Sequence, residues 1–159
     1  MQDPKIWQNI TTGAWCYYGN KTANGTKYGK LYNWYAVCDP RGLAPNGYHI
    51  PTDNEWTILT DYLGGESVAG TKMKSTSGWD NDGNGTNTSG FAGLPGGFRT
   101  KDGDFYDIGA YAYWWSSSEN GDNGTSSAWY RYLFNYIGGV EKFPNENKQN
   151  GFSVRCIKD

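Results

Sequence analysis

The residues best suited to metal chemistry lie in one short polar segment. The sequence from Asp80 to Gly85 reads Asp-Asn-Asp-Gly-Asn-Gly. Oxygen-bearing side chains at positions one, three and five, with glycine at six, are typical of the first half of an EF-hand calcium loop. The second half is missing, because position twelve is Phe91 where a bidentate glutamate is needed. The pattern predicts either a weak calcium site at Asp80, Asp82 and Asn84 or a solvated turn.

Catalytic side chains are scarce. His49 is the only histidine, so a zinc site or a Ser-His-Asp triad would depend on it alone. We expect it to pack in a structural role before a helix. A carboxylate pair for glycoside hydrolysis could be drawn from Asp102, Asp104, Asp107 and Glu119, but acidic residues beside loop glycines are usually turn residues. We therefore expect that the chain is not an enzyme.

A third set of residues suits ligand recognition. Aromatic side chains alternate with polar ones between Tyr130 and Glu146, which is the composition of a recognition surface. The alternative is that Trp129, Arg131 and Leu133 point into the core and the tyrosines only complete a sheet. The candidate ligand-binding residues are Tyr130, Tyr132, Phe134, Asn135, Tyr136, Ile137, Glu141, Lys142, Phe143, Asn145 and Glu146.

Helices must position these residues. Thr52 followed by Glu55 forms a capping box, which predicts a helix start. An apolar stripe at Trp56, Leu59 and Leu63 continues that helix until Gly64-Gly65. A shorter helix is predicted over 31–38, because Leu31, Trp34, Tyr35 and Cys38 share one face and Asp39-Pro40 stops the pattern.

The rest of the chain predicts loops and strands. Residues 70–99 are rich in Gly, Ser, Thr and Asn with isolated aromatics, which predicts a long ordered loop with short strand pieces. Strand-like residues follow at 113–115, 126–136 and 151–157. Residues 132–149, with turn signals at Gly138-Gly139 and Pro144-Asn145, are expected to form a hairpin or a loop excursion.

Composition excludes several partner classes. The chain of 159 residues has 14 basic and 16 acidic side chains and a net charge of −2, without a basic block, so nucleic acid is not an expected partner. No apolar run is long enough for a membrane helix, and direct membrane insertion is not expected. The polar start Met1-Gln2-Asp3-Pro4 is not a signal peptide, so we expect a cytoplasmic protein or a mature fragment.

Six separated blocks of the sequence resemble the Fibrobacter succinogenes major paralogous domain. They lie at 28–56, 90–91, 94–99, 113–119, 128–131 and 151–156, and the resemblance extends from about Gly13 to Lys158. It implies an α+β, C-type lectin-like fold of the formylglycine-generating-enzyme (sulfatase-modifying-factor) branch. Two helices would pack on an irregular antiparallel sheet with long loops, in one domain over 1–159 with residues 1–12 as an N-terminal lead-in.

The resemblance also bears on the cysteines. Enzymes of this branch are copper-dependent oxidases with two close cysteines, and no such pair occurs among Cys16, Cys38 and Cys156. Family members often carry a cysteine where this chain has Ala44, able to pair with the C-terminal one. Cys38 would be its substitute as the partner of Cys156, and the alternative is three reduced thiols.

The function implied is a non-enzymatic binding module of a secreted or cell-surface bacterial protein, with adhesion as one role. Glycan ligands would use aromatic faces and polar side chains, although the calcium-dependent sugar motifs of true C-type lectins do not occur. Protein ligands suit the apolar Phe134, Ile137 and Phe143. Two alternatives are a target protein diversified by a retroelement, variable between Arg131 and Asn150, and a scaffold domain whose recognition residues are buried against a neighbour.

Overall fold

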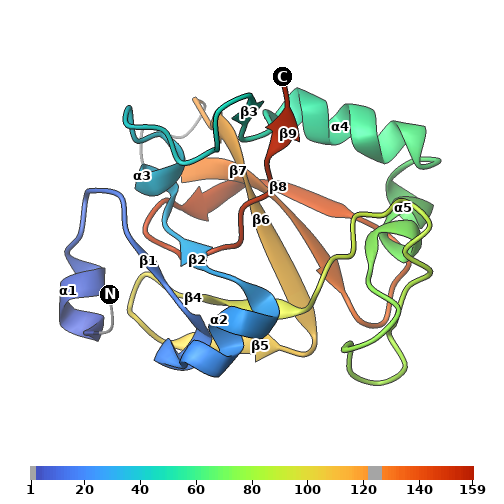
Figure 1. The fold of residues 1–159 in the computed structure, drawn as a ribbon, viewed down its shortest axis with the longest axis horizontal. Coiled ribbons are helices and arrows are strands. Elements are labelled where there is room, and N and C mark those ends of the chain that lie inside the picture. The colour runs from blue at the N-terminus through green and yellow to red at the C-terminus, as the bar shows by residue number, and fades with distance from the viewer. Residues whose placement is uncertain (1–2, 122–126) are drawn as a thin grey trace.

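A five-stranded sheet with the strand order β5-β4-β6-β7-β8 forms the centre of the computed structural model, which describes residues 3–121 and 127–159 without the Asn145 side chain (Figure 1). Its strands are β4 Gly96–Arg99, β5 Phe105–Ile108, β6 Tyr111–Glu119, β7 Ser127–Phe134 and β8 Glu141–Asn147. β4 and β6 run parallel at Gly97 and Ala112. The other pairs are antiparallel, so the prediction of a purely antiparallel sheet is wrong in one pairing.

Helices and small strand pairs surround this sheet. The α-helices are α1 Pro4–Gln8, α2 Thr22–Tyr28, α3 Trp34–Val37, α4 Asp53–Tyr62 and α5 Glu66–Met73, with a 3₁₀ turn η1 at Tyr18–Asn20. β1 Trp15–Cys16 pairs with β2 Leu31–Tyr32, and β3 Tyr48–His49 pairs with β9 Ile157–Lys158. The predicted α+β class is confirmed. None of the helices among the described residues combines the length and apolar character that crossing a bilayer requires.

The predicted capping box is present at the start of α4. Thr52 Oγ1 accepts a hydrogen bond from the Glu55 backbone N–H at 3.2 Å, and Glu55 Oε2 accepts one from the Thr52 N–H at 2.8 Å. The two orphan donors of the first turn are thereby satisfied. Trp56 and Leu63 of the predicted stripe are buried, so local capping and the hydrophobic period together determine this helix.

The helix predicted over 31–38 is wrong at its start. Leu31 and Tyr32 form β2, and the helix begins only after Asn33. The Asn33 side chain is fully buried and accepts hydrogen bonds from the backbone N–H groups of Ala14 (2.8 Å) and Ala36 (3.1 Å). It caps α3 from an extended backbone position and ties the residue before β1 to that helix.

The predicted long loop is shorter than expected, because α5 occupies its first residues. Gly65 caps α5 without a side-chain bond, and Gly70 lies inside it, so the sequence lacks the usual signals of a helix. The remaining loop, 74–95, carries only an isolated bridge between Lys74 and Gly93.

The C-terminal strand predicted over 151–157 is interrupted. Residues 151–153 make isolated bridges to Arg99, Tyr32 and Trp114, and only Ile157–Lys158 is a strand. The predicted strand 126–136 is β7 from residue 127 to 134, and residue 126 lies outside the described residues. The terminal segment therefore joins the small sheets to the central one.

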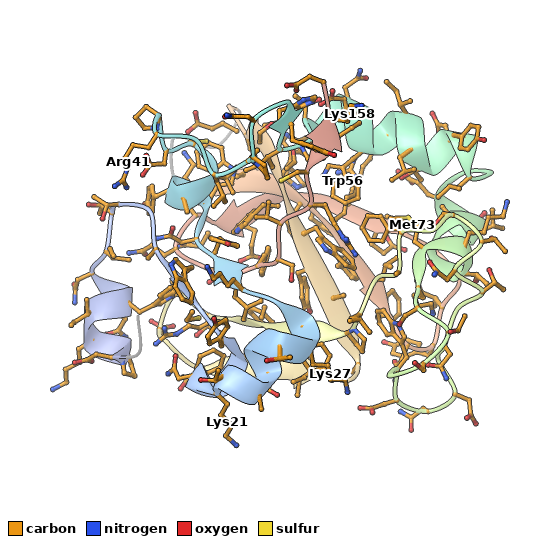
Figure 2. All side chains as sticks on the ribbon, viewed as in Figure 1. Lys21, Lys27, Arg41, Trp56, Met73 and Lys158 are labelled. Carbon is orange, nitrogen blue, oxygen red and sulfur yellow. The ribbon has the colours of Figure 1, made fainter. Side chains whose placement is uncertain are left out.

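The central sheet has a core on each face. On one face, α4 and α5 pack Trp56, Leu63 and Met73 against Trp114 and Leu133; Figure 2 shows Trp56 and Met73 beneath these helices. The other face carries a second cluster that is closed at one end by α3 and the terminal segment, with members Trp34, Val37, Ile50, Trp115, Ala128, Tyr130 and Phe152. The opposite end of that second face stays open.

The cysteines are free thiols. Cys16 is buried, and burial raises the pKa of its thiol. Cys38 and Cys156 are exposed and not bonded to each other, so the disulfide alternative is not formed.

His49 lies at the surface between two carboxylates. Its Nδ1 is 2.7 Å from Asp159 Oδ1, and its Nε2 is 2.8 Å from Glu55 Oε1. These contacts join β3 to the C-terminal residue and to the first turn of α4. Hydrogen bonds with Asp159 and then with Glu55 raise the pKa of His49. Its role is a structural clasp, half-buried at the surface and not packed in the core.

This clasp predicts a pH dependence of stability. Because the folded-state pKa of His49 is raised, its contribution is complete below the unfolded pKa of about 6.5 and is lost as the pH rises through the folded value. The pKa of Glu55 is lowered, by the Thr52 N–H and then by His49. Its contribution is therefore present above its unfolded pKa and is lost as the pH falls through the folded value.

The variant His49→Gln should not show the fall in stability that the wild type shows as the pH rises through the folded-state pKa of His49. Thermal unfolding of both proteins, measured at several pH values across neutrality, tests this. Wild type should be more stable than the variant at mildly acidic pH, and the two should converge at alkaline pH. Parallel curves would contradict the clasp.

Candidate ligand-binding face

Six aromatic side chains cover the open end of the second face of the sheet. Successive strand residues point to opposite faces, so residues two apart share one. Register pairs Tyr111 with Phe134, Tyr113 with Tyr132, and Tyr130 with Phe143. We call this surface the aromatic sheet face; its members are Tyr111, Tyr113, Tyr130, Tyr132, Phe134 and Phe143.

The rings of this face stack on one another. Tyr111 and Phe134 have centroids 5.4 Å apart and an interplanar angle of 12°, and Tyr111 and Tyr113 are 5.8 Å apart at 9°. Tyr132 and Phe143 are 6.0 Å apart at 27°. Because neighbouring rings occupy much of each other's flat surfaces, the face presents ring edges and phenol hydroxyls outward. Such a surface is rigid, apolar in its body and hydrogen-bonding at its tips.

Exposure increases toward the edge strand β8 and toward the β7–β8 turn. Tyr130 is only 9% exposed, whereas Phe143 is 46% and Tyr136 is 72% exposed. Tyr136 packs edge-on against Phe134 at 4.6 Å, and its hydroxyl lies 3.3 Å from that of Tyr111. This hydroxyl contact is the main cause that raises the pKa of Tyr111 to about 12. Tyr136 therefore extends the aromatic sheet face beyond the strands.

Three acidic side chains, Asp107, Glu141 and Glu146, lie beside the aromatic sheet face and form what we call its acidic rim. Asp107 Oδ2 accepts a hydrogen bond from the Tyr113 hydroxyl at 2.7 Å, with the Asp107 backbone in the left-handed region at φ 68°. Burial, and next this carboxylate, raise the pKa of Tyr113. Glu141 lies opposite Tyr132 in the register, and burial raises the pKa of Glu146.

The basic side chains of the same strands are engaged elsewhere. Arg99 stacks on Trp7, Arg131 is bound to Asp53, and Lys142 pairs with Glu66 at 3.5 Å. Lys142, a predicted ligand-binding residue, lies on the opposite side of β8 from its neighbours Glu141 and Phe143. The acidic rim has no basic counterpart on these strands.

Two further candidates support the turn. Asn135 is 7% exposed and donates from Nδ2 to the Asp80 carbonyl at 3.3 Å. The carbonyl of Ile137 accepts from the buried Lys74 Nζ at 2.9 Å, and Lys74 also donates to the carbonyl of Phe134 at 3.2 Å. The amide of Asn135, a predicted ligand contact, is thus hydrogen-bonded inside the protein. Lys74 instead fixes the turn that carries Tyr136.

The predicted excursion is more regular than expected. Residues 127–147 form the paired strands β7 and β8, with a register shift between Ala128 and Tyr130. The hairpin alternative is thus confirmed. Within it Tyr130, Tyr132, Phe134, Tyr136, Glu141, Phe143 and Glu146 are gathered at the aromatic sheet face or its rim, while the predicted Asn145 side chain lies outside the described residues.

The Asp80–Gly85 segment lies against the same turn. Asn84 Oδ1 accepts from the Trp79 backbone N–H at 3.1 Å, and the Asp80 carbonyl accepts from Gly83 and from Asn135. Asp82 is exposed. Within residues 3–121 and 127–159, no group of three or more His, Cys, Asp or Glu side chains could hold a metal ion. The segment's visible role is to support the β7–β8 turn.

Sequence reasoning missed Tyr111, Tyr113 and Asp107 as members of the site. The alternation of Tyr111 and Tyr113 with Ala112 and Trp114 is a period-two signal that places the tyrosines on one face. The contact with Asp107 had no comparable signal, because it depends on how β5 is placed.

Comparisons with known proteins extend the resemblance found in the sequence blocks. A family model described as the Fibrobacter succinogenes major domain matches residues 2–158. No curated protein and no solved structure matches the chain. The family match spans the helices, the central sheet and the aromatic sheet face, so the resemblance concerns the whole fold and not one motif.

Proposed function

The chain belongs to the Fibrobacter succinogenes major domain family, and we propose that it is a non-enzymatic binding module that recognises a protein ligand through the aromatic sheet face. We further propose that the fold is C-type lectin-like and that the module is secreted or displayed at the cell surface. The observation that carries the proposal is the stacked aromatic face, which is open to solvent at Phe143 on the edge strand β8 and at Tyr136 beside the β7–β8 turn.

The chemistry of this face supports a protein ligand. Tyrosine edges supply rigid amphipathic contact area at low entropic cost, as in antibody combining sites. Flat sugar rings would need exposed aromatic faces, and stacking occupies most of these here. The acidic rim of Asp107, Glu141 and Glu146 favours a basic partner, since electrostatic complementarity steers association and selects partners.

Three contacts of the β7–β8 turn support a surface whose sequence is constrained over one that a retroelement diversifies. Asn135 bonds inside the protein. A Cβ at Gly138 would lie 2.7 Å from Thr71 Oγ1, and one at Gly139 would lie 3.0 Å from the Glu66 carbonyl oxygen. Substitutions at these positions would displace the turn.

We expect the double variant Tyr136→Ala/Phe143→Ala to lose ligand binding without unfolding. Truncating central aromatic contacts costs more than about 1 kcal/mol each, so affinity should fall about tenfold or more. The probes are an array of peptides graded from acidic to basic and an array of neutral and acidic glycans. The matched control is Ile58→Ala/Tyr62→Ala, which truncates two exposed apolar residues of α4, 60% and 86% exposed.

Binding of basic peptides that the face variant loses and the α4 variant keeps would support the proposal. If only glycans bind, and the face variant loses that binding, the proposal of a protein ligand would be overturned. If both variants lose the same affinity for basic peptides, or if the wild type binds no peptide, the aromatic sheet face is not a protein-binding site. A large drop in melting temperature in the face variant would instead favour a scaffold role.

A further inference from the structure

A groove is lined by residues of α2, of β2 and of the C-terminal segment around Ser153. It has a volume of about 580 Å³, within the range of small-ligand sites, roughly 300–1,000 Å³. We call it the cationic groove. Its side chains include Tyr17, Lys27, Tyr28, Lys30, Tyr32 and Arg155.

The groove concentrates positive charge in an acidic protein. Lys27, Lys30 and Arg155 line it and no Asp or Glu does, although the chain has a net charge of −2. None of the three forms an ion pair with a carboxylate of the described residues. Lys27 Nζ instead lies 4.8 Å from the centroid of Tyr28, and Lys30 Nζ lies 4.0 Å from that of Trp15. Aromatic rings hold these cations while their charge stays uncompensated.

Arg155 is fixed by a strained loop. Its guanidinium lies 4.7 Å from the centroid of Phe91 and donates from Nη2 to the Phe91 carbonyl at 2.7 Å and the Ala92 carbonyl at 3.5 Å. Ala92 also lines the groove and has a left-handed backbone at φ 51°, held by a 2.7 Å bond from its N–H to Asn87 Oδ1. Strain of this kind in a non-glycine residue is typical of ligand sites, where it pre-organises the contacts.

We propose that the cationic groove binds a short acidic saccharide through its carboxylates. Arg155, Lys27 and Lys30 would pair with the carboxylates by charge-assisted hydrogen bonds. The hydroxyl groups of Tyr17, Tyr32 and Ser153 offer donors and acceptors for sugar hydroxyls. A long polyanion fits less well, because the net negative charge of the protein repels it outside the groove.

The groove is separate from the aromatic sheet face. Its β6 residue is Trp114, whose neighbour Tyr113 points to the opposite side of the strand, toward the aromatic sheet face. The proposal therefore goes beyond the protein-binding role and does not depend on it.

Calorimetric titration with trigalacturonic acid, and with neutral galactotriose as the matched sugar, tests the groove. We expect the acidic trisaccharide to bind and the neutral one to bind about tenfold more weakly or not at all. The variant Lys27→Gln/Lys30→Gln should lose about tenfold in affinity for the acidic sugar. Added salt should weaken wild-type binding and affect the variant less.

The charge-matched control is Lys5→Gln/Lys158→Gln, whose residues lie outside the groove lining. Figure 2 shows Lys158 beside α4, away from Lys27 at the α2 end of the molecule. This control should bind like wild type. Arg155→Lys keeps the charge but loses the guanidinium fork, and it should weaken binding. Its melting temperature should also fall, because the fork bonds the Phe91 and Ala92 carbonyls.

Equal affinity for the acidic and neutral sugars would overturn the proposal. The proposal would also be overturned if the groove and control variants lost the same affinity for trigalacturonic acid, or if folded wild-type protein did not bind it. None of these results would affect the peptide-binding test of the aromatic sheet face.

Discussion

Replacing Arg131 with alanine is expected to lower the free energy of unfolding by about 3 kcal/mol, because it removes the buried partner of a half-buried ion pair and three further hydrogen bonds of its guanidinium. Arg131 is 2% exposed, and its Nη1 donates to Asp53 Oδ1 at 2.5 Å. Its Nη2 donates to the Asp53 carbonyl and to Thr57 Oγ1, both at 3.1 Å. These bonds join β7 to the first turn of α4. The variant should therefore weaken the packing of α4 against the sheet, on which the core around Trp56 and Trp114 depends.

Urea unfolding of Arg131→Ala, Asp53→Ala and the double variant measures this coupling. The loss in the double variant should be smaller than the sum of the single losses, by roughly 1–3 kcal/mol. Arg131→Lys should fall between wild type and Arg131→Ala, because it retains the charge without the planar fork. Additive losses would show that the pair does not couple β7 to α4.

Gly70→Ala is expected to destabilise the protein by on the order of 3 kcal/mol or more, although alanine normally stabilises a helix interior relative to glycine. A Cβ at Gly70 would lie 2.0 Å from the Gly139 carbonyl oxygen and 2.8 Å from that of Gly138. The two backbones meet there through the bond from Thr71 N–H to the Gly138 carbonyl, 2.8 Å long. The contact joins α5 to the β7–β8 turn, so neither partner is a flexible side chain.

Gly121→Ala is the control, because among the described residues nothing lies within 4 Å of its added Cβ. Its stability should change by no more than about 0.5 kcal/mol. Thermal or urea unfolding of both variants gives the comparison. The Gly70 variant should also bind peptides more weakly, since displacing the turn moves Tyr136. A Gly70 variant as stable as wild type would show that the approach of α5 and the turn is not tight.

Local rules predicted the elements whose signals are local. The capping box at Thr52 and the stripe through Trp56 gave α4 correctly, since both signals lie within the helix itself. The helix predicted over 31–38 was wrong at its start, because the buried side chain of Asn33 caps α3 there. That side chain also bonds Ala14, which lies in a distant segment. α5 was missed because the close packing that requires Gly70 also removes the usual helix signal.

The candidate site was predicted in its sequence location but not in its form. Composition pointed to the region around Tyr132 and Phe143, and the structure adds Tyr111, Tyr113 and Asp107 from other strands. Lys142 lies on the other side of β8 from Glu141 and Phe143, which strand alternation within the segment could have indicated. The hydrogen bonds of Asp107 and Asn135 depend on how distant segments pack against each other, which no single segment encodes.

Site-specific photo-crosslinking tests the central claim most directly. The variant Tyr136→p-benzoylphenylalanine places the photoreactive group at the exposed end of the aromatic sheet face, and Tyr62→p-benzoylphenylalanine places it on α4, where Tyr62 is 86% exposed. Each is irradiated with the basic peptides selected on the array. The account predicts covalent peptide adducts at position 136 and none at position 62. Adducts at 62 alone, or at neither position while the peptides still bind, would contradict it.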